Sequence, residues 1–200
     1  MDNAVWLSLL SAAFDSCAYI IYNLEFWRGR SKPNKATWAL WFYIATLNAS
    51  SYLVSSHDVV KTLLALENAG MCGLTLAVVL FRGKSEKLKP WEWVTVASGV
   101  ATGAVWIISR HAFYANAVLQ FGTFISVIPT YAKLWKDPRR EPPLPWFMWS
   151  VIYIALCIVV MLRWRGSWHD IVYPLNYVLF HFAVFVLTLR RWTKKSPATS

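Results

Sequence analysis

Polar side chains suited to binding a small solute lie within long apolar segments of this sequence. An Asn or Gln amide offers both a hydrogen-bond donor and an acceptor, which suits a ligand rich in hydroxyl groups. A polar group in hydrocarbon must find a partner or face water, so each one needs a reason to be there. The sequence therefore predicts a polar binding site inside an apolar protein, formed by Asn68, Asn176, Glu67, Gln120, Asn48 and Asp15.

The two acids of this set, Glu67 and Asp15, have three functional interpretations. A charge at the centre of a membrane helix costs about 2.5–3.5 kcal/mol on insertion scales. The two groups are therefore expected to be kept neutral, to contact a cationic ligand group, or to carry a coupling proton. The structural alternative is that each carboxyl group bonds a neighbouring hydroxyl for packing.

Other chemistry is not indicated. The sequence contains no H-E-x-x-H or G-x-S-x-G motif and no clustered Asp and His residues, so we expect no enzyme, no metal and no cofactor. Cys17, Cys72 and Cys157 lie in apolar segments without C-x-x-C spacing, which favours buried thiols. The formal net charge of +10 does not predict nucleic-acid binding, because no segment has the polar surface of such a module.

The elements that carry the polar residues read as membrane helices. Hydrophobic residues make up 57% of the chain and charged residues only 15%, whereas soluble domains have about 25% charged residues. A transmembrane helix needs about 20 mostly apolar residues. Seven segments qualify as predicted spans: 4–24, 37–56, 59–81, 91–109, 113–135, 145–163 and 170–190.

The basic residues predict the orientation of these spans. Sixteen of the 20 fall in the first, third and fifth connections and the tail: Arg28, Arg30, Lys32, Lys35, Arg82, Lys84, Lys87, Lys89, Lys133, Lys136, Arg139, Arg140, Arg190, Arg191, Lys194 and Lys195. Cytoplasmic loops of membrane proteins carry the excess of Lys and Arg. We therefore expect a multi-pass protein of the inner or plasma membrane with its N-terminus outside and its C-terminus in the cytoplasm.

An internal repeat divides the chain. A shift of 108 residues places Trp27, Trp38, Trp41, Asn68 and Arg82 on Trp135, Trp146, Trp149, Asn176 and Arg190. Spans one to three then repeat as spans five to seven in the same direction, as parallel repeats do. The sequence predicts a first three-helix repeat over 1–83, a linker helix over 84–111, a second repeat over 112–192 and a tail over 193–200.

This 3+1+3 plan resembles the SWEET and PQ-loop membrane transporters. The likeness extends to uncharacterised bacterial seven-helix proteins with a K-P-x-x-x-[ST]-W-x-x-W element, present here over 32–41. Transporters of the PnuC type are a more distant analogue. The Pro-Gln pair of the PQ-loop group is absent. The resemblance implies that Asn68 and Asn176, like the paired Asn residues of SWEET transporters, hold a solute between the third and seventh spans.

Several residues are candidates for gating. Pro129 and Pro174 interrupt spans, where a proline removes a backbone hydrogen bond and bends the helix. Trp41 and Trp149 are predicted either to close an inner gate or to stack on a ligand, with interfacial anchorage as the favoured alternative. Trp38 and Trp146, which precede them by one turn, are predicted to be interfacial anchors.

Gly99 and Gly103 form a G-x-x-x-G pattern in the fourth span. Such a pattern lets a second helix approach closely. We expect the linker helix to pack on the first repeat, with a homo-oligomer contact as the alternative.

These features predict a transporter or facilitator for a small polar solute, sugar-like or resembling a vitamin or nucleoside. It would work by alternating access between the two repeats. The alternative is an integral membrane scaffold or accessory subunit that transports nothing. The expected partners are the lipid bilayer and the solute.

Overall fold

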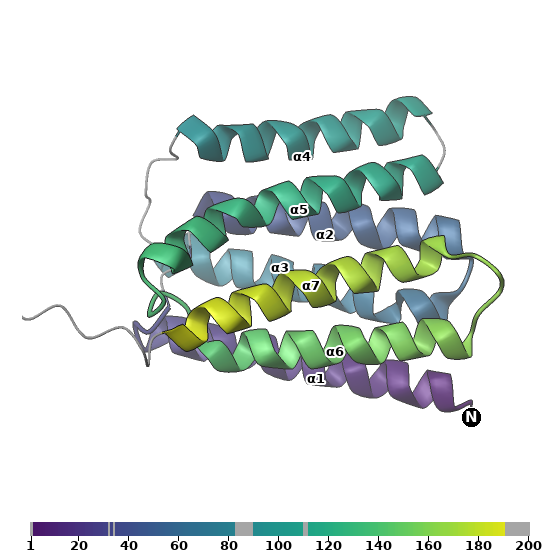
Figure 1. Ribbon diagram of the computed structural model, residues 1–200, viewed down its shortest axis with the longest axis horizontal. Coiled ribbons are helices and arrows are strands. Elements are labelled where there is room, and N and C mark those ends of the chain that lie inside the picture. The colour runs from purple at the N-terminus through teal and green to yellow at the C-terminus, as the bar shows by residue number, and fades with distance from the viewer. Residues whose placement is uncertain (1, 32, 34, 83–89, 110–111, 191–200) are drawn as a thin grey trace, which may run out of the picture.

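The chain folds into seven helices that lie side by side (Figure 1). The computed structural model describes residues 2–31, 33, 35–82, 90–109 and 112–190, and these residues contain no strand. The helices are α1 (Asn3–Trp27), α2 (Lys35–Ser56), α3 (Val59–Arg82), α4 (Pro90–Ser109), α5 (Ala112–Lys136), α6 (Pro143–Leu162) and α7 (His169–Leu189). Each coincides with one predicted apolar segment to within three residues at both ends, so the all-α class and the positions of the helices are confirmed.

Four helices in the described part of the chain are long and apolar enough to cross a membrane. They are α1, α3, α6 and residues Asp170–Leu189 of α7. The other three helices have comparable lengths.

Local sequence explains where several helices begin and end. The Asp2 side chain accepts a hydrogen bond from the Ala4 amide at 3.2 Å and caps α1. Gly29, with φ of +74°, ends the same helix in the left-handed conformation that glycine adopts without strain. Asp58 caps α3 by accepting from the amides of Val60 and Lys61 at 3.0 and 3.3 Å.

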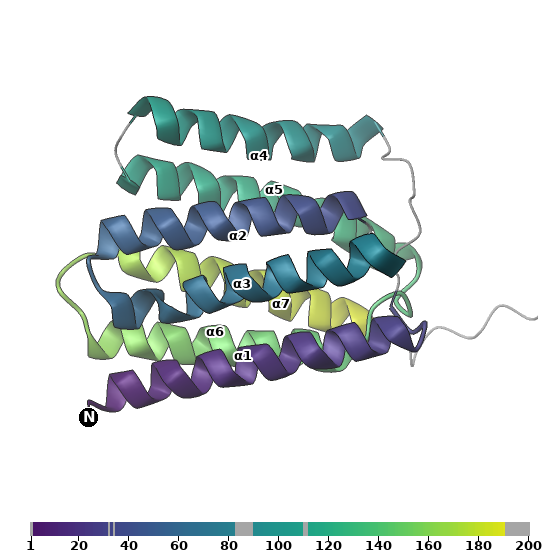
Figure 2. The ribbon, with the colours of Figure 1, turned by 180° about the vertical axis from the view of Figure 1, so that it is seen from behind.

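For reference we call α1–α3 and α5–α7 the two triplets, with α4 between them in the chain. Helix α3 contacts both α1 and α2, and α7 contacts both α5 and α6. The triplets meet where α1 packs on α6 and α2 packs on α5. Helix α4 lies at the edge of the bundle and packs mainly on α5, with a smaller contact to α2, contrary to the expectation that it packs on the first repeat (Figure 2).

Apolar side chains cover much of the outside of this bundle, and its interior contains polar as well as apolar side chains. Phe81 is 90% exposed and Ile108 80% exposed, whereas Asp15 and Thr75 are fully buried. Soluble proteins rarely expose apolar surface on this scale. Exposed apolar surface of this extent indicates an interaction site for a membrane or for another protein.

The two ends of the bundle differ in charge. The start of α1 and the α2–α3 and α6–α7 connections lie at what we call the N-terminal end, and the α1–α2 and α5–α6 connections lie at the opposite end (Figure 1). Described basic residues gather at the opposite end: Arg28, Arg30, Lys35, Arg82, Lys133, Lys136, Arg139, Arg140 and Arg190. Lys32, Lys84, Lys87, Lys89, Arg191, Lys194 and Lys195 lie outside the described residues, as does the predicted tail over 193–200.

Candidate functional site

A small cavity lies between the two triplets. Its volume is about 40 Å³, which leaves room for about one water molecule. Six helices contribute to its wall, represented by Tyr19 of α1, Ala45 of α2, Asn68 of α3, Ser126 of α5, Trp149 of α6 and Tyr177 of α7. The cavity therefore has a mixed wall of aromatic rings, hydroxyl groups and one amide.

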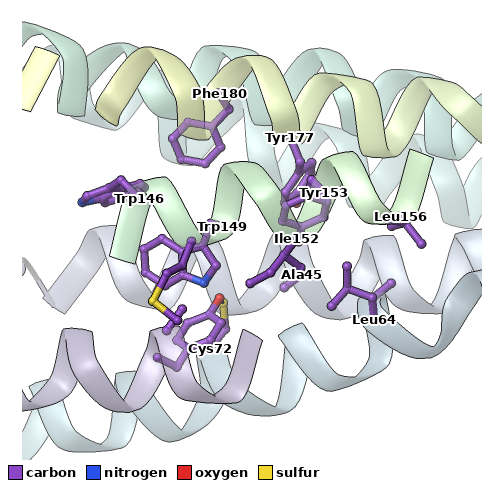
Figure 3. Close-up of a cluster of buried hydrophobic side chains, with 14 of the residues drawn as sticks. Ala45, Leu64, Cys72, Trp146, Trp149, Ile152, Tyr153, Leu156, Tyr177 and Phe180 are labelled. Atoms are coloured by element: carbon purple, nitrogen blue, oxygen red, sulfur yellow. The ribbon is translucent and has the colours of Figure 1, made fainter. Parts of the chain in front are cut away.

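Four tryptophans belong to the aromatic part of this wall. The ring centroids of Trp38 and Trp41 lie 5.1 Å apart, those of Trp41 and Trp146 6.2 Å apart, and those of Trp146 and Trp149 4.9 Å apart. Edge-to-face contacts of this kind stabilise aromatic clusters. The Trp41–Trp146 contact joins the two triplets, and Figure 3 shows Trp146 and Trp149 beside Phe180 in the same buried cluster.

The prediction that Trp38 and Trp146 anchor the protein at the membrane interface is wrong. Both are almost fully buried, because they lie on the faces of α2 and α6 that meet the other helices. Exposed tryptophans with nearby cations occur elsewhere, at the opposite end of the bundle. The guanidinium carbon of Arg82 lies 3.4 Å from the Trp27 ring centroid, and that of Arg190 lies 4.0 Å from the Trp135 ring centroid.

Three of the four indole N–H groups in the cavity wall have no acceptor among the described residues. The Nε1 atoms of Trp41, Trp146 and Trp149 are buried and form no hydrogen bond to any described residue. Trp149 lies near the Asp15 carboxyl group, and Trp146 lies near Glu141, but neither pair has the geometry of a hydrogen bond. Buried polar groups in folded proteins almost always have a partner, so each exception calls for an explanation.

Asn68 is the only one of the six predicted binding residues that lines the cavity among the residues the structure describes. Its amide nitrogen donates to the Tyr19 hydroxyl at 2.8 Å. Asp15, fully buried, lies just behind the wall, close to Asn68 and Glu67. Glu67 accepts a hydrogen bond from the Ser16 hydroxyl at 2.5 Å.

The remaining predicted residues form a separate chain of amides between the triplets. Gln120 donates to Asn48 at 2.9 Å, and Asn176 donates to the Gln120 side chain at 3.0 Å. Asn116 also donates to Asn48, at 3.2 Å. Asn68 and Asn176 thus belong to different hydrogen-bonded groups and are not paired with each other. Asn116 was missed from the sequence, although it stands one helical turn before Gln120 on the same face of α5.

An ionic cluster joins the triplets at the N-terminal end. Arg163 at the end of α6 donates to Asp58 at 2.8 Å and to Asp2 at 3.0 Å. Lys61, fully buried, donates to the Asp170 carboxylate at 2.5 Å. We call these two connections, Asp58–Arg163 and Lys61–Asp170, the ionic latch.

The charge on Asp58 is stabilised within this latch. Burial alone would raise the pKa of its carboxyl group, but the hydrogen bonds from Arg163 and from the amides of Lys61 and Val60 outweigh burial and lower that pKa. The latch was not anticipated, because the sequence does not show which acid on one helix end meets which base on another.

At the opposite end, Glu25 pairs with Arg28 and Arg30, and Asp137 lies 3.8 Å from Arg140. Glu141, before α6, lies 3.4 Å from both the Tyr22 and the Ser31 hydroxyls. Burial raises the pKa of Glu141 to about 7, against the opposing effect of hydrogen bonds from Tyr22 and Ser31.

Two hollows open at this end. One, of about 40 Å³, is lined by Glu141 and also by Trp38 and Trp41, which line the central cavity as well. A larger hollow of about 790 Å³ lies between Glu25, Arg30, Asp137 and Arg140.

The remaining candidate residues are the two prolines within helices and the two glycines of α4. Pro174 is buried inside α7. Pro129 lies within α5, but its side chain is outside the described residues, as are the surroundings of Gly99. Gly103 packs closely on α2 of the same chain. A Cβ atom added to it would lie 1.8 Å from the Tyr43 hydroxyl oxygen.

These contacts define a site whose wall is shared by both triplets and whose polar groups are partly unpartnered. Within the described residues, no three His, Cys, Asp or Glu side chains are grouped to hold a metal ion. Comparison of the chain with protein-family models, with curated proteins and with solved structures gave no match.

Proposed function

We propose that this protein is a seven-span membrane carrier that moves a small polar solute by alternating access between its two helix triplets. The central cavity is the proposed solute site. Asn68 and the free indole N–H groups of its wall bind acceptor groups of the solute, such as hydroxyl oxygens. The aromatic rings contact its apolar faces.

The observation that carries this proposal is the set of unpartnered donors around the central cavity. An unsatisfied buried donor costs about 1–3 kcal/mol, and Trp41, Trp146 and Trp149 each contribute one. A bundle selected only for packing would fill this space with apolar side chains at no such cost. The unpartnered indole N–H groups are explained if a solute and water bind to them alternately.

A two-fold repeat supports the alternating mechanism. Under the shift of 108 residues the α1–α6 contact becomes the α5–α2 contact, and the α2–α3 contact becomes the α6–α7 contact. The Arg82–Trp27 and Arg190–Trp135 cation–π pairs are related by the same shift. Residues 1–83 and 112–192 then act as two similar bodies about an axis along the membrane normal, with α4 as the linker.

The difference between the two ends supports a conformation closed at the N-terminal end. The ionic latch joins the triplets there, whereas Trp38 and Trp41 separate the central cavity from a hollow at the opposite end. A sugar-sized or nucleoside-sized solute is larger than a cavity of about 40 Å³. Transport therefore requires the triplets to separate, first with Trp41 moving and then with the latch broken.

The excess of basic residues at the opposite end supports a cytoplasmic location for that end. The N-terminus is then outside, and the C-terminus is in the cytoplasm. A reporter fused after residue 200 is expected to be active in the cytoplasm. Activity outside the cell would overturn this orientation.

The test is solute flux through the purified protein in liposomes, with a panel of sugars, nucleosides and organic acids. The wild-type protein is expected to equilibrate at least one of them. Ala45 lines the cavity, so Ala45→Val should block flux by placing two methyl groups in a space of about 40 Å³. Ala39→Val on the exposed face of the same helix is the matched control and should transport normally.

Absence of flux for every solute in the panel would overturn the carrier proposal and favour a scaffold without transport. Equal flux through Ala45→Val and Ala39→Val would place the pathway elsewhere in the bundle.

A further inference from the structure

Two carboxyl groups lie close together where α1 packs on α3. The Asp15 side chain is fully buried, and neither of its oxygens has a hydrogen-bond partner in the described part of the chain. Glu67 lies beside it and accepts from Ser16 through one oxygen, while its second oxygen is buried without a partner.

No cation among the described residues balances this pair. Lys61 lies on the same helix as Glu67, about 9 Å from it along the helix axis. Lys61 is bound to Asp170 instead. His181 donates through Nδ1 to the Tyr177 carbonyl oxygen at 2.7 Å, and its ring stacks on Tyr153. The titratable groups that interact with Asp15 from its own and neighbouring helices are all acidic or neutral: Glu67, Cys72, Tyr19, Tyr153 and Tyr173.

Two ionised carboxylates cannot remain adjacent in such a place, because burial and mutual repulsion both disfavour the second charge. A proton on one of them removes both costs. The proton belongs on Asp15, because Glu67 has the Ser16 hydroxyl to stabilise its charge, whereas neither Asp15 oxygen accepts a hydrogen bond from any described residue.

We propose that Asp15 and Glu67 form a proton-binding site, with the proton on Asp15, and that this site couples transport to proton movement. This inference rests on the proposed carrier function. The equivalent positions of the second repeat are Thr123 and Leu175. Each chain therefore carries one such site and moves one proton per cycle.

The position of Asp15 explains how the proton and the solute interact. Asp15 adjoins Asn68 and Trp149, and both of these also line the cavity. When Asp15 loses its proton, its negative charge lies next to the N–H donors of Asn68 and Trp149. These donors then bind the carboxylate and release the solute. Rebinding the proton frees the donors for a solute. Proton and solute therefore bind together and leave together, in symport.

Infrared spectroscopy of the purified protein tests the proton site without any solute. The protein is labelled with carboxyl-¹³C aspartate, so that signals from Glu67 and Glu141 do not shift. The other aspartates are exposed or bound to cations: Asp2, Asp58, Asp137 and Asp170. A ¹³C-shifted band of one protonated carboxyl group is expected at neutral pH.

Asp15→Asn, which keeps the shape and mimics the protonated form, should remove this band and leave thermal stability unchanged. Glu67→Gln should retain the band. Absence of the band from the wild-type protein, or its persistence in Asp15→Asn, would overturn the proposal. So would a band that appears only when sodium is withheld, because the site would then bind a metal cation.

Flux measurements separate this inference from the carrier proposal. Vesicles containing the pH indicator pyranine receive each solute of the panel in turn. Entry of a solute with acidification of the interior supports symport. Entry without acidification would overturn coupling while leaving the carrier proposal intact, and entry of no solute would overturn both.

Discussion

The buried Lys61–Asp170 pair provides a quantitative test of the ionic latch. The Lys61 side chain is fully buried and that of Asp170 is 6% exposed. Removing one partner leaves the other charge buried and uncompensated, which costs about 3–5 kcal/mol. Lys61→Met and Asp170→Leu should each lower stability by that amount. For a chain of this size the loss corresponds to a fall in Tm of about 6–20 °C.

The double variant Lys61→Met/Asp170→Leu should recover most of this loss, because no unpaired charge remains. The assay is thermal unfolding in detergent, read as a double-mutant cycle. Arg165→Met is the control, since Arg165 is 62% exposed and 3.9 Å from Asp58, and it should cost at most about 1 kcal/mol. Additive losses for the two single variants would refute the reasoning.

Three further predictions concern other contacts. Burial raises the pKa of Glu141 from its usual 4.5 to about 7. Between these two pH values, Glu141 keeps a proton in the native state that it loses on unfolding. Stability should therefore fall by about 3 kcal/mol as the pH rises through this range, and Tm values of Glu141→Gln at pH 5 and 8 should lack this fall. Gln120→Leu removes a partner of Asn48 and Asn176 and should cost about 1 kcal/mol in denaturant unfolding; no loss would show that the amide chain is not stabilising. Gly103→Ala should lower Tm by displacing the Tyr43 hydroxyl, and adding Tyr43→Phe should restore it; failure of rescue would contradict this contact.

The positions of the helices could be predicted because apolar segments and their charged connections repeat regularly along the chain. Lipid-facing and buried positions are both apolar in such helices, however, so the sequence shows poorly which face points inward. Trp38 and Trp146 illustrate this limit: their places near helix starts indicated interfacial anchors, yet both are buried and pack against Tyr22.

The polar site was predicted in part for a related reason. Burial of Asn68 and Asp15 followed from their place in apolar segments. Their partners depend on contacts between helices far apart in the sequence. Repeat symmetry suggested that Asn68 and Asn176 face each other, but Tyr19 and Gln120, which are not equivalent, bind them instead. The latch residues Arg163 and Asp58 likewise appeared in the sequence only as charges in connections.

Access to the central cavity from each side of the membrane tests alternating access most directly. Ser126 lines the cavity and is buried, and Ser126→Cys in a chain whose Cys17, Cys72 and Cys157 are replaced by Ala places one thiol there. In oriented vesicles, a membrane-impermeant thiol reagent should label this cysteine from either side, and Ala39→Cys on the lipid-facing surface should stay unlabelled. Labelling of Ser126→Cys from one side only, or from neither, would contradict alternating access.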